Sequence, residues 1–338
     1  MKRLVINEPG LFLCTRKGMI IVKKKGEKIL EVSPSNISQV IVLTRGASFS
    51  SAFIRLLARH KIDLILYSGF GFPIAKLSST KDSGAIKLRK MQYKSQNETI
   101  GIHLAKKFAW AKVNNQKVIL REAGKNRRDL ILSAQLLELS KSISNIADMI
   151  INIEENNNDK ARKEIIRLEA EAAELYWKGF KLLLPEGIEF PGRRKRFENP
   201  EDPVNIMLNF CYGLLASEIL LAVDNIGLDP YAGFLHMDSP RRPALVMDIL
   251  EEFRQPVADR VVLRLISSFK DPNSIIEKGR LKRDARINVV KAFYERLSEN
   301  ITFYGRKLPL SSHIFLQTRR IAEFILGRSN DYIPFTLR

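Results

Sequence analysis

The chain has 338 residues, and 45% of them are apolar, which is enough to bury a substantial core and argues against intrinsic disorder. Its 56 Lys and Arg outnumber its 37 Asp and Glu, and the resulting formal charge of +19 indicates a polyanionic partner such as nucleic acid. A basic protein whose charge serves only solubility is the alternative. Cys14 and Cys211 are too few for a disulfide framework or a cysteine-based zinc knuckle, so a reducing intracellular setting is expected.

The first 80 residues are expected to form short strands around one helix over residues 51–59. Runs of β-branched and large apolar residues, separated by glycine or polar turn residues, predict strands over residues 11–14, 19–22, 37–43 and 63–66. Gly69 and Gly71 predict a tight turn before a last strand over residues 74–77. A phosphate-binding loop is the less favoured interpretation, because Ile74 stands where a third glycine would complete the dinucleotide pattern.

Helical patterns follow from about residue 82. Apolar residues recur at helical spacing in six segments, residues 102–121, 128–153, 160–183, 203–224, 244–254 and 283–297. Residues 185–203 contain several prolines and a basic run at 193–196, which predicts a connecting loop whose charges either bind phosphate or are only solvated. The expected fold class is α+β, with a strand-rich domain over residues 1–82 and a larger, all-helical domain over residues 83–338.

No membrane partner is expected. The sequence MKRLVINEPG reaches an acid and a proline before any long apolar stretch, which argues against a signal peptide. Residues 206–223 are apolar enough to resemble a membrane span, but Asn209, Ser217 and Glu218 interrupt them. The better interpretation is a buried helix of a soluble, cytoplasmic protein.

Three segments could each supply one ligand to a metal ion: Glu169 in RLEAEAAELYW, His236 in GLDPYAGFLH and Glu251 in MDILEEFR. Two carboxylates and an imidazole suit Mg²⁺ or Mn²⁺ and leave positions open for phosphate and water. By spacing alone, Glu169 is better explained as part of a solvated acidic face of a helix. His236 is as well explained as a structural histidine as it is as a ligand.

Asp248, Glu251 and Glu252 have a spacing that places all three on one side of a helix. Crowded carboxylates repel one another unless a cation joins them. That cation is either a divalent metal or, through ordinary ion pairs, one of the arginines Arg241, Arg242 and Arg254. The spacing leaves both possibilities open.

Four segments, taken together, resemble successive landmarks of the CRISPR-associated integrases of spacer acquisition, the Cas-one family. They are EAEAAELYW, DPVNIMLNFCYGLL, GLDPYAGFLH and DILEEFRQPVADRVV. AKVNNQKVILR, the strand-rich opening and LPLSSHIFLQTRRIAEFILG are also similar to that family, so the resemblance covers essentially the whole chain. Two departures, Ala170 in place of the usual glycine and residues 243–245 in place of a Ser-Leu pair, affect fine positioning and leave the ligands intact.

The resemblance implies an N-terminal β-domain that drives homodimerisation and a helical domain that binds Mg²⁺ or Mn²⁺. The implied metal ligands and catalytic residues are Glu169, His236 and Glu251. The resemblance also makes Asp248 an auxiliary acid, and it makes Asn205 and Tyr212 supporting residues of the site.

The implied activity is that of a metal-dependent DNA endonuclease and integrase, which inserts fragments of foreign DNA into a CRISPR array by phosphoryl transfer. The implied partners are double-stranded, branched and CRISPR repeat DNA, a second copy of the chain, and a small ferredoxin-like companion, Cas-two, in a heteromeric complex. Two alternatives remain open: a non-enzymatic nucleic-acid scaffold, and a Holliday-junction or RNA nuclease with the same metal centre.

Overall fold

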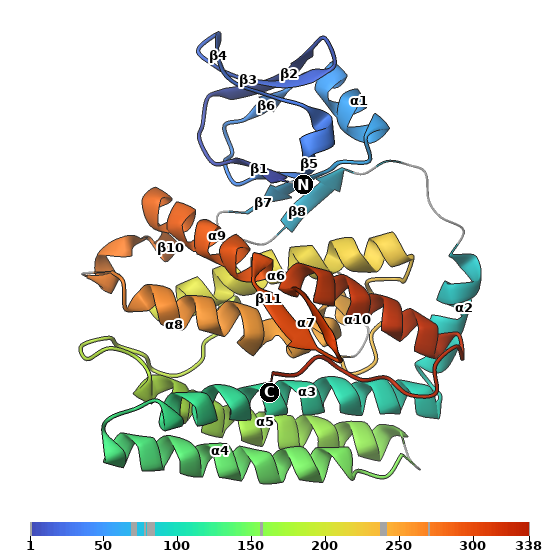
Figure 1. The fold of residues 1–338 in the computed structure, drawn as a ribbon, viewed down its shortest axis with the longest axis vertical. Helices are drawn as coiled ribbons and strands as arrows, with labels where there is room; N and C mark the ends of the chain where they lie inside the picture. The colour runs from blue at the N-terminus through green and yellow to red at the C-terminus, as the bar shows by residue number, and fades with distance from the viewer. Residues whose placement is uncertain are drawn as a thin grey trace. The chain divides into compact units, whose positions relative to one another are not determined.

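The computed structural model describes residues 2–68, 73–77, 79, 85–155, 158–236, 242–269 and 271–337. The chain divides into two compact units, residues 1–83 and residues 84–338. The first unit is rich in strands and the second is mostly helical (Figure 1), so the predicted α+β fold class is confirmed.

The described part of the first unit contains two four-stranded sheets and one helix. Its elements are β1 (Lys2–Ile6), β2 (Leu11–Arg16), β3 (Met19–Lys24), β4 (Glu27–Val32), β5 (Ile37–Val42), β6 (Ser48–Phe49), α1 (Ser51–Arg59), β7 (Asp63–Tyr67) and β8 (Pro73–Leu77). One sheet has the strand order β1-β5-β7-β8, in which only β8 is antiparallel to its neighbour. The other has the order β4-β3-β2-β6. Leu13, Ile20, Val40 and Phe53 join both sheets and α1 in one apolar core.

Three strands of this unit, β1, β4 and the two-residue β6, are not predicted from the sequence patterns. β4 lies at the edge of its sheet, where Ile29 and Leu30 are exposed, so its apolar residues do not mark a core face. The turn predicted at Gly69 and Gly71 lies outside the described residues.

The second unit contains all six predicted helical segments and further elements that the patterns do not predict. Its helices are α2 (Ile86–Ser95), α3 (Thr99–Lys125), α4 (Leu130–Ile151), α5 (Asn158–Leu182), α6 (Pro203–Ile226), α7 (Ala244–Phe253), α8 (Arg260–Ile266), α9 (Arg283–Ser298) and α10 (Leu310–Ile325). Its hairpins pair β9 (Ile276–Glu277) with β10 (Arg280–Leu281) and β11 (Asn300–Phe303) with β12 (Arg306–Pro309). The expectation of an all-helical domain is therefore wrong in this detail.

Within this unit, α3, α4 and α5 lie side by side, and α3 also contacts α7 (Figure 1). A π-helix, Arg254–Asp259, continues α7 into α8, at a point where Pro256 offers no backbone N–H. Wider turns of this kind often occur at functional sites, and this one follows directly on the acidic cluster of α7.

α6 forms the centre of the second unit. Asp202 caps its first turn by accepting a hydrogen bond from the backbone N–H of Asn205 at 2.8 Å, and Gly227 ends it in the left-handed conformation. Among the described helices it alone is long and apolar enough to cross a membrane, yet 83% of its apolar window is buried inside the protein. The prediction of a core helix over residues 206–223 is therefore confirmed.

Candidate metal centre

Glu169 lies on α5 and turns inward toward Lys112 of α3. Its side chain is 19% exposed, and Glu169 Oε1 forms a short contact with the ammonium of Lys112. Glu164, Glu171 and Glu174 on the same helix are more exposed, and each forms an ion pair with a cation three or four residues away. Glu169 therefore does not belong to the solvated acidic face to which its spacing assigned it.

Lys112 joins two of the predicted ligands. Its Nζ atom contacts Glu169 and also lies 3.0 Å from Glu251 Oε2, so one ammonium lies between carboxylates from α5 and α7. Burial opposes the charge of this lysine, but Glu169 and Glu251 outweigh burial and raise the pKa of Lys112. The two carboxylates thus create a strong local preference for a cation.

Glu251 is almost completely buried and remains a carboxylate. Burial opposes its ionisation, but Arg254, Lys112 and His236 together lower the pKa of Glu251 to about 2. Arg254 Nη2 lies 3.0 Å from Glu251 Oε1, so the ion pair expected from the spacing does form. Arg241, another arginine considered from the sequence, lies outside the described residues.

Asp248 organises the segment that carries His236. This fully buried carboxylate accepts hydrogen bonds from the backbone N–H groups of Phe234, Leu235 and His236 at 2.5, 3.0 and 2.9 Å. Its Oδ1 also lies 2.6 Å from Nδ1 of His236. The tautomer that matches this contact carries its proton on Nδ1, which leaves Nε2 as the nitrogen that can bind a metal, 3.9 Å from Glu251 Oε1.

Tyr212 packs against Arg254, the arginine that pairs with Glu251, and belongs to a buried network that sequence reasoning did not find. Its hydroxyl donates to Asp259 Oδ1 at 2.6 Å, and the hydroxyl of Tyr176 donates to Asp259 Oδ2 at 2.7 Å. Burial raises the pKa of Asp259, although the two tyrosines oppose the shift. The guanidinium carbons of Arg193 and Arg254 lie 5.2 and 5.0 Å from the centre of the Tyr212 ring, which brings two cations next to the site.

Among the described residues, Asn205 forms hydrogen bonds with the basic loop and with Asp202, and none with Glu169 or Glu251. Its Oδ1 accepts from Arg193 Nη1 at 2.9 Å and from the backbone N–H of Arg194 at 2.8 Å, and its Nδ2 donates to the Gly192 carbonyl at 2.8 Å. Arg193 also donates to Asn209 Oδ1 at 2.7 Å. The basic residues of the predicted loop therefore differ in placement: Arg193 is held toward the site, whereas Arg194 and Lys195 are exposed.

The donor set fits a hard divalent cation in its chemistry. In the described part of the chain, no three His, Cys, Asp or Glu side chains converge tightly enough to hold an ion, and the ammonium of Lys112 lies between two of the predicted ligands. Glu251 Oε2 is buried and has no hydrogen-bond partner among the described residues, although Lys112 is within ion-pair distance. A buried carboxylate oxygen of this kind is available for coordination by Mg²⁺ or Mn²⁺.

The model of the protein family described as CRISPR associated protein Cas1 matches residues 4–295 of this chain. The chain belongs to the Cas1 family. A CRISPR-associated endonuclease Cas1 from Archaeoglobus fulgidus is 36% identical to it over 335 residues, which are 96% of each chain. The family and the CRISPR-associated endonuclease predicted from the motifs are thereby confirmed.

Solved structures show the same fold. A casposase bound to its integration product is 24% identical and has a TM-score of 0.83, with 98% of this Cas1 chain and 93% of the casposase covered. A chain of a Cas6-RT-Cas1–Cas2 complex is 20% identical and has a TM-score of 0.78, with all of this chain and 36% of that chain covered. The strand-rich unit followed by a helical unit is therefore the architecture of this family.

Proposed function

We propose that this Cas1 chain is a metal-dependent DNA integrase and endonuclease that inserts DNA fragments as new spacers into a CRISPR array. The observation that carries the proposal is the meeting of Glu169 and Glu251, from two different helices, around one cation, with the imidazole of His236 beside them. Membership of a family of CRISPR-associated endonucleases supports nuclease chemistry. The casposase with this fold, which is bound to an integration product, supports strand transfer.

Glu169, His236 and Glu251 would hold the metal, which is Mg²⁺ or Mn²⁺. When bound, the ion would withdraw charge from the phosphodiester and lower the pKa of the attacking hydroxyl or water. Asp248 keeps Nε2 of His236 directed toward Glu251, and Arg254 keeps Glu251 ionised. Arg193 and Arg254 place positive charge where a phosphate of the DNA would approach.

The partners follow from charge and from the family. A formal charge of +19 supports binding to double-stranded and branched DNA, including the CRISPR repeat. We assign homodimerisation to the N-terminal domain, residues 1–82, and metal binding to residues 83–338. The Cas1–Cas2 complex among the solved structures supports a companion of the Cas-two type. Burial of α6 within the protein supports action in the cytoplasm.

Strand transfer on labelled DNA tests this proposal. Linear and branched duplexes carrying a CRISPR repeat are incubated with the full-length protein and the companion in Mg²⁺, in Mn²⁺ or in EDTA. We expect joined products in either metal and none in EDTA. Binding in all three conditions with no covalent product would favour a scaffold, and cleavage of the branched duplex without joining would favour a junction nuclease.

Lys112→Met is expected to raise the affinity for Mn²⁺ by about tenfold or more, because a metal ion and the ammonium compete for the same two carboxylates. In EDTA the same variant is expected to lose about 1–3 kcal/mol of stability, because Glu251 loses its lysine and keeps only Arg254 as an ion-pair partner. Calorimetric titration with Mn²⁺ and thermal unfolding in EDTA measure the two effects.

Lys106→Met is the matched control for this variant. Lys106 lies on the same helix and is also buried, but its ammonium pairs with Glu155 at 2.5 Å. Its removal should leave Mn²⁺ affinity unchanged. Equal Mn²⁺ affinity in wild type and in the Lys112 variant would show that the ammonium does not occupy the metal position.

A further inference from the structure

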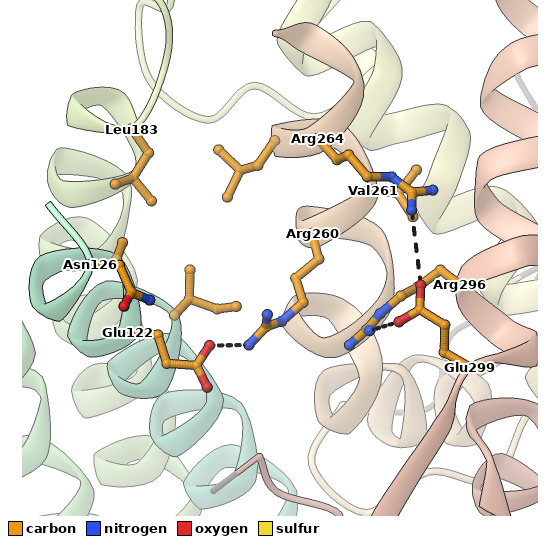
Figure 2. A pocket seen from close by; sticks show the side chains of 11 residues that line it. Glu122, Asn126, Leu183, Arg260, Val261, Arg264, Arg296 and Glu299 are labelled. Carbon is orange, nitrogen blue, oxygen red and sulfur yellow. Dashed lines mark hydrogen bonds and ion pairs between the residues drawn. The ribbon is translucent and has the colours of Figure 1, made fainter. Parts of the chain in front are cut away.

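A cavity of about 420 Å³ opens in the helical unit away from the candidate metal centre (Figure 2). It lies between the last turns of α3, the residue after α5, α8 and the end of α9. Glu122, which lines it, is ten residues beyond Lys112, or about 15 Å along α3. This volume is near the lower end of the range for ligand sites, which suits one nucleotide and excludes a duplex.

The cavity has an apolar side and a cationic side. Apolar side chains come from α3, α8 and the residue after α5; they are Ile119, Ala123, Leu183, Val261 and Leu263. Three arginines, Arg260, Arg264 and Arg296, line the rest with Glu122, Glu299 and Asn126. Arg260 and Arg264 are four residues apart and therefore lie on one face of α8. Figure 2 shows Arg260 directed toward Glu122, and Arg264 and Arg296 directed toward Glu299.

The arginines are only partly neutralised. Arg264 is 51% exposed and lies 3.7 Å from Glu295 and 3.9 Å from Glu299, so both of its ion pairs are loose. Nε of Arg260 is buried and has no hydrogen-bond partner in the part of the chain that the structure describes. Burial, partly offset by Glu299, lowers the pKa of Arg296, so another anion would be favourable there.

A phosphate can replace these glutamates at small cost. Glu122 and Glu299 are 39% and 43% exposed, so each carboxylate can turn into water when a phosphate takes its place on the arginine. Arginine binds phosphate oxygens through two parallel N–H groups, which a single carboxylate at 3.7 Å does not satisfy. Lys125, Arg127 and Arg128 follow along the chain at the end of α3 and are exposed, so positive charge extends beyond the cavity.

We propose that this cavity binds one unpaired nucleotide of a single-stranded DNA end, with its phosphate on Arg260 and Arg264 and its base against the apolar side. Asn126 supplies an amide that can donate to and accept from the edge of the base. The choice of DNA rests on the proposed function, whereas the choice of an unpaired nucleotide rests on the size and the two-sided chemistry of the cavity.

Equilibrium binding in EDTA tests the proposal on the full-length chain. The probes are a labelled duplex with an unpaired end of several nucleotides, a blunt duplex of the same length and a single-stranded RNA. Arg264→Ala is expected to weaken binding of the duplex with the unpaired end by about tenfold and to reduce its salt dependence by about one ion. Binding of the blunt duplex should change by less than about twofold.

Arg319→Ala is the matched control, because Arg319 is an exposed helical arginine that is also paired, with Glu323 at 2.9 Å. Glu122→Gln is a second variant, expected to tighten binding of the unpaired end several-fold because it frees Arg260. Equal weakening of both duplexes by Arg264→Ala, or an effect no larger than that of Arg319→Ala, would overturn the proposal. RNA bound more tightly than the DNA end would overturn the choice of DNA.

These measurements separate this proposal from the proposed function, because binding in EDTA does not depend on a metal or on strand transfer. If the arginines of α8 only connect helices, Glu122→Gln lowers the unfolding temperature and leaves the affinity for the unpaired end unchanged. If the protein binds the unpaired end through Arg264 but never joins DNA, the nucleotide site is supported and the integrase function is overturned.

Discussion

His236→Ala is expected to abolish metal-dependent strand transfer, with a loss of more than about 100-fold, while most DNA binding remains. Changes in residues that only orient a metal ligand already cost about 10–100-fold, and this change removes the ligand itself. The imidazole is also the group that Asp248 holds in place through Nδ1 and three backbone N–H groups. Joined product in Mn²⁺, together with the shift of the unfolding temperature on adding Mn²⁺, measures the effect.

His103→Ala is the matched control for this variant. Its imidazole is also partly buried and contacts two carboxylates, Glu155 at 3.1 Å and Asp331 at 2.8 Å, but it lies outside the candidate metal centre. It should retain both strand transfer and the Mn²⁺-dependent shift. Undiminished strand transfer by His236→Ala, with clean metal-free controls, would remove His236 from the mechanism.

The sequence predicts those parts of the fold whose apolar residues mark a buried face. The helical spacing in α3 to α6 corresponds to helices that bury one side or, for α6, nearly every side. β9 and β10 have two residues each, too few for any periodicity to appear. α10 is different, because its buried Ile314, Ile321 and Ile325 recur at helical spacing, and that helix could have been predicted.

The candidate site, like the fold, is predicted only in part from the sequence. Motifs indicate Glu169, His236 and Glu251 by position along the chain, but nothing local indicates Lys112, which is 57 residues from Glu169. Glu169 points inward, where it pairs with Lys112. The residue spacing within α5 contains no sign of that lysine, and it therefore places Glu169 on the exposed acidic face. Asp259 is a further example, because its two tyrosine partners are 83 and 47 residues away. Contacts at such separations depend on tertiary packing, which single-sequence spacing does not contain.

The C-terminal segment packs against Glu252, the residue next to Glu251 of the candidate metal centre. The Glu252 carboxylate is buried, and it accepts hydrogen bonds from Tyr332, from the backbone N–H of Phe335 at 2.7 Å and from Gln317 at 3.2 Å. Burial raises the pKa of Glu252 to about 7, although these hydrogen bonds oppose the shift. The segment after α10 therefore holds the end of α7, and it also reaches α3 through Asn115, which donates a hydrogen bond to the Phe335 carbonyl at 3.2 Å.

Phe335→Ala is expected to lower the free energy of unfolding by about 3–5 kcal/mol, because it leaves a cavity in a closed aromatic cluster. Phe335 is fully buried, and its ring centre lies 4.9 Å from that of Phe253 and 4.8 Å from that of Phe303. Denaturant unfolding in EDTA measures the loss. Phe315→Ala is the control, because Phe315 is 40% exposed and its removal should cost less than about 1 kcal/mol.

Phe335→Ala should also weaken Mn²⁺ binding. Phe253 ends the helix that carries Glu251, and the packing of Phe253 against Phe335 fixes the direction of that carboxylate. Calorimetric titration below the unfolding transition separates this effect from the loss of stability. A Phe335→Ala protein with wild-type Mn²⁺ affinity would show that the C-terminal segment stabilises the helical unit without positioning Glu251. Weaker Mn²⁺ binding would instead make that segment part of the support of the candidate metal centre, although it lies beyond the last residue matched by the family model.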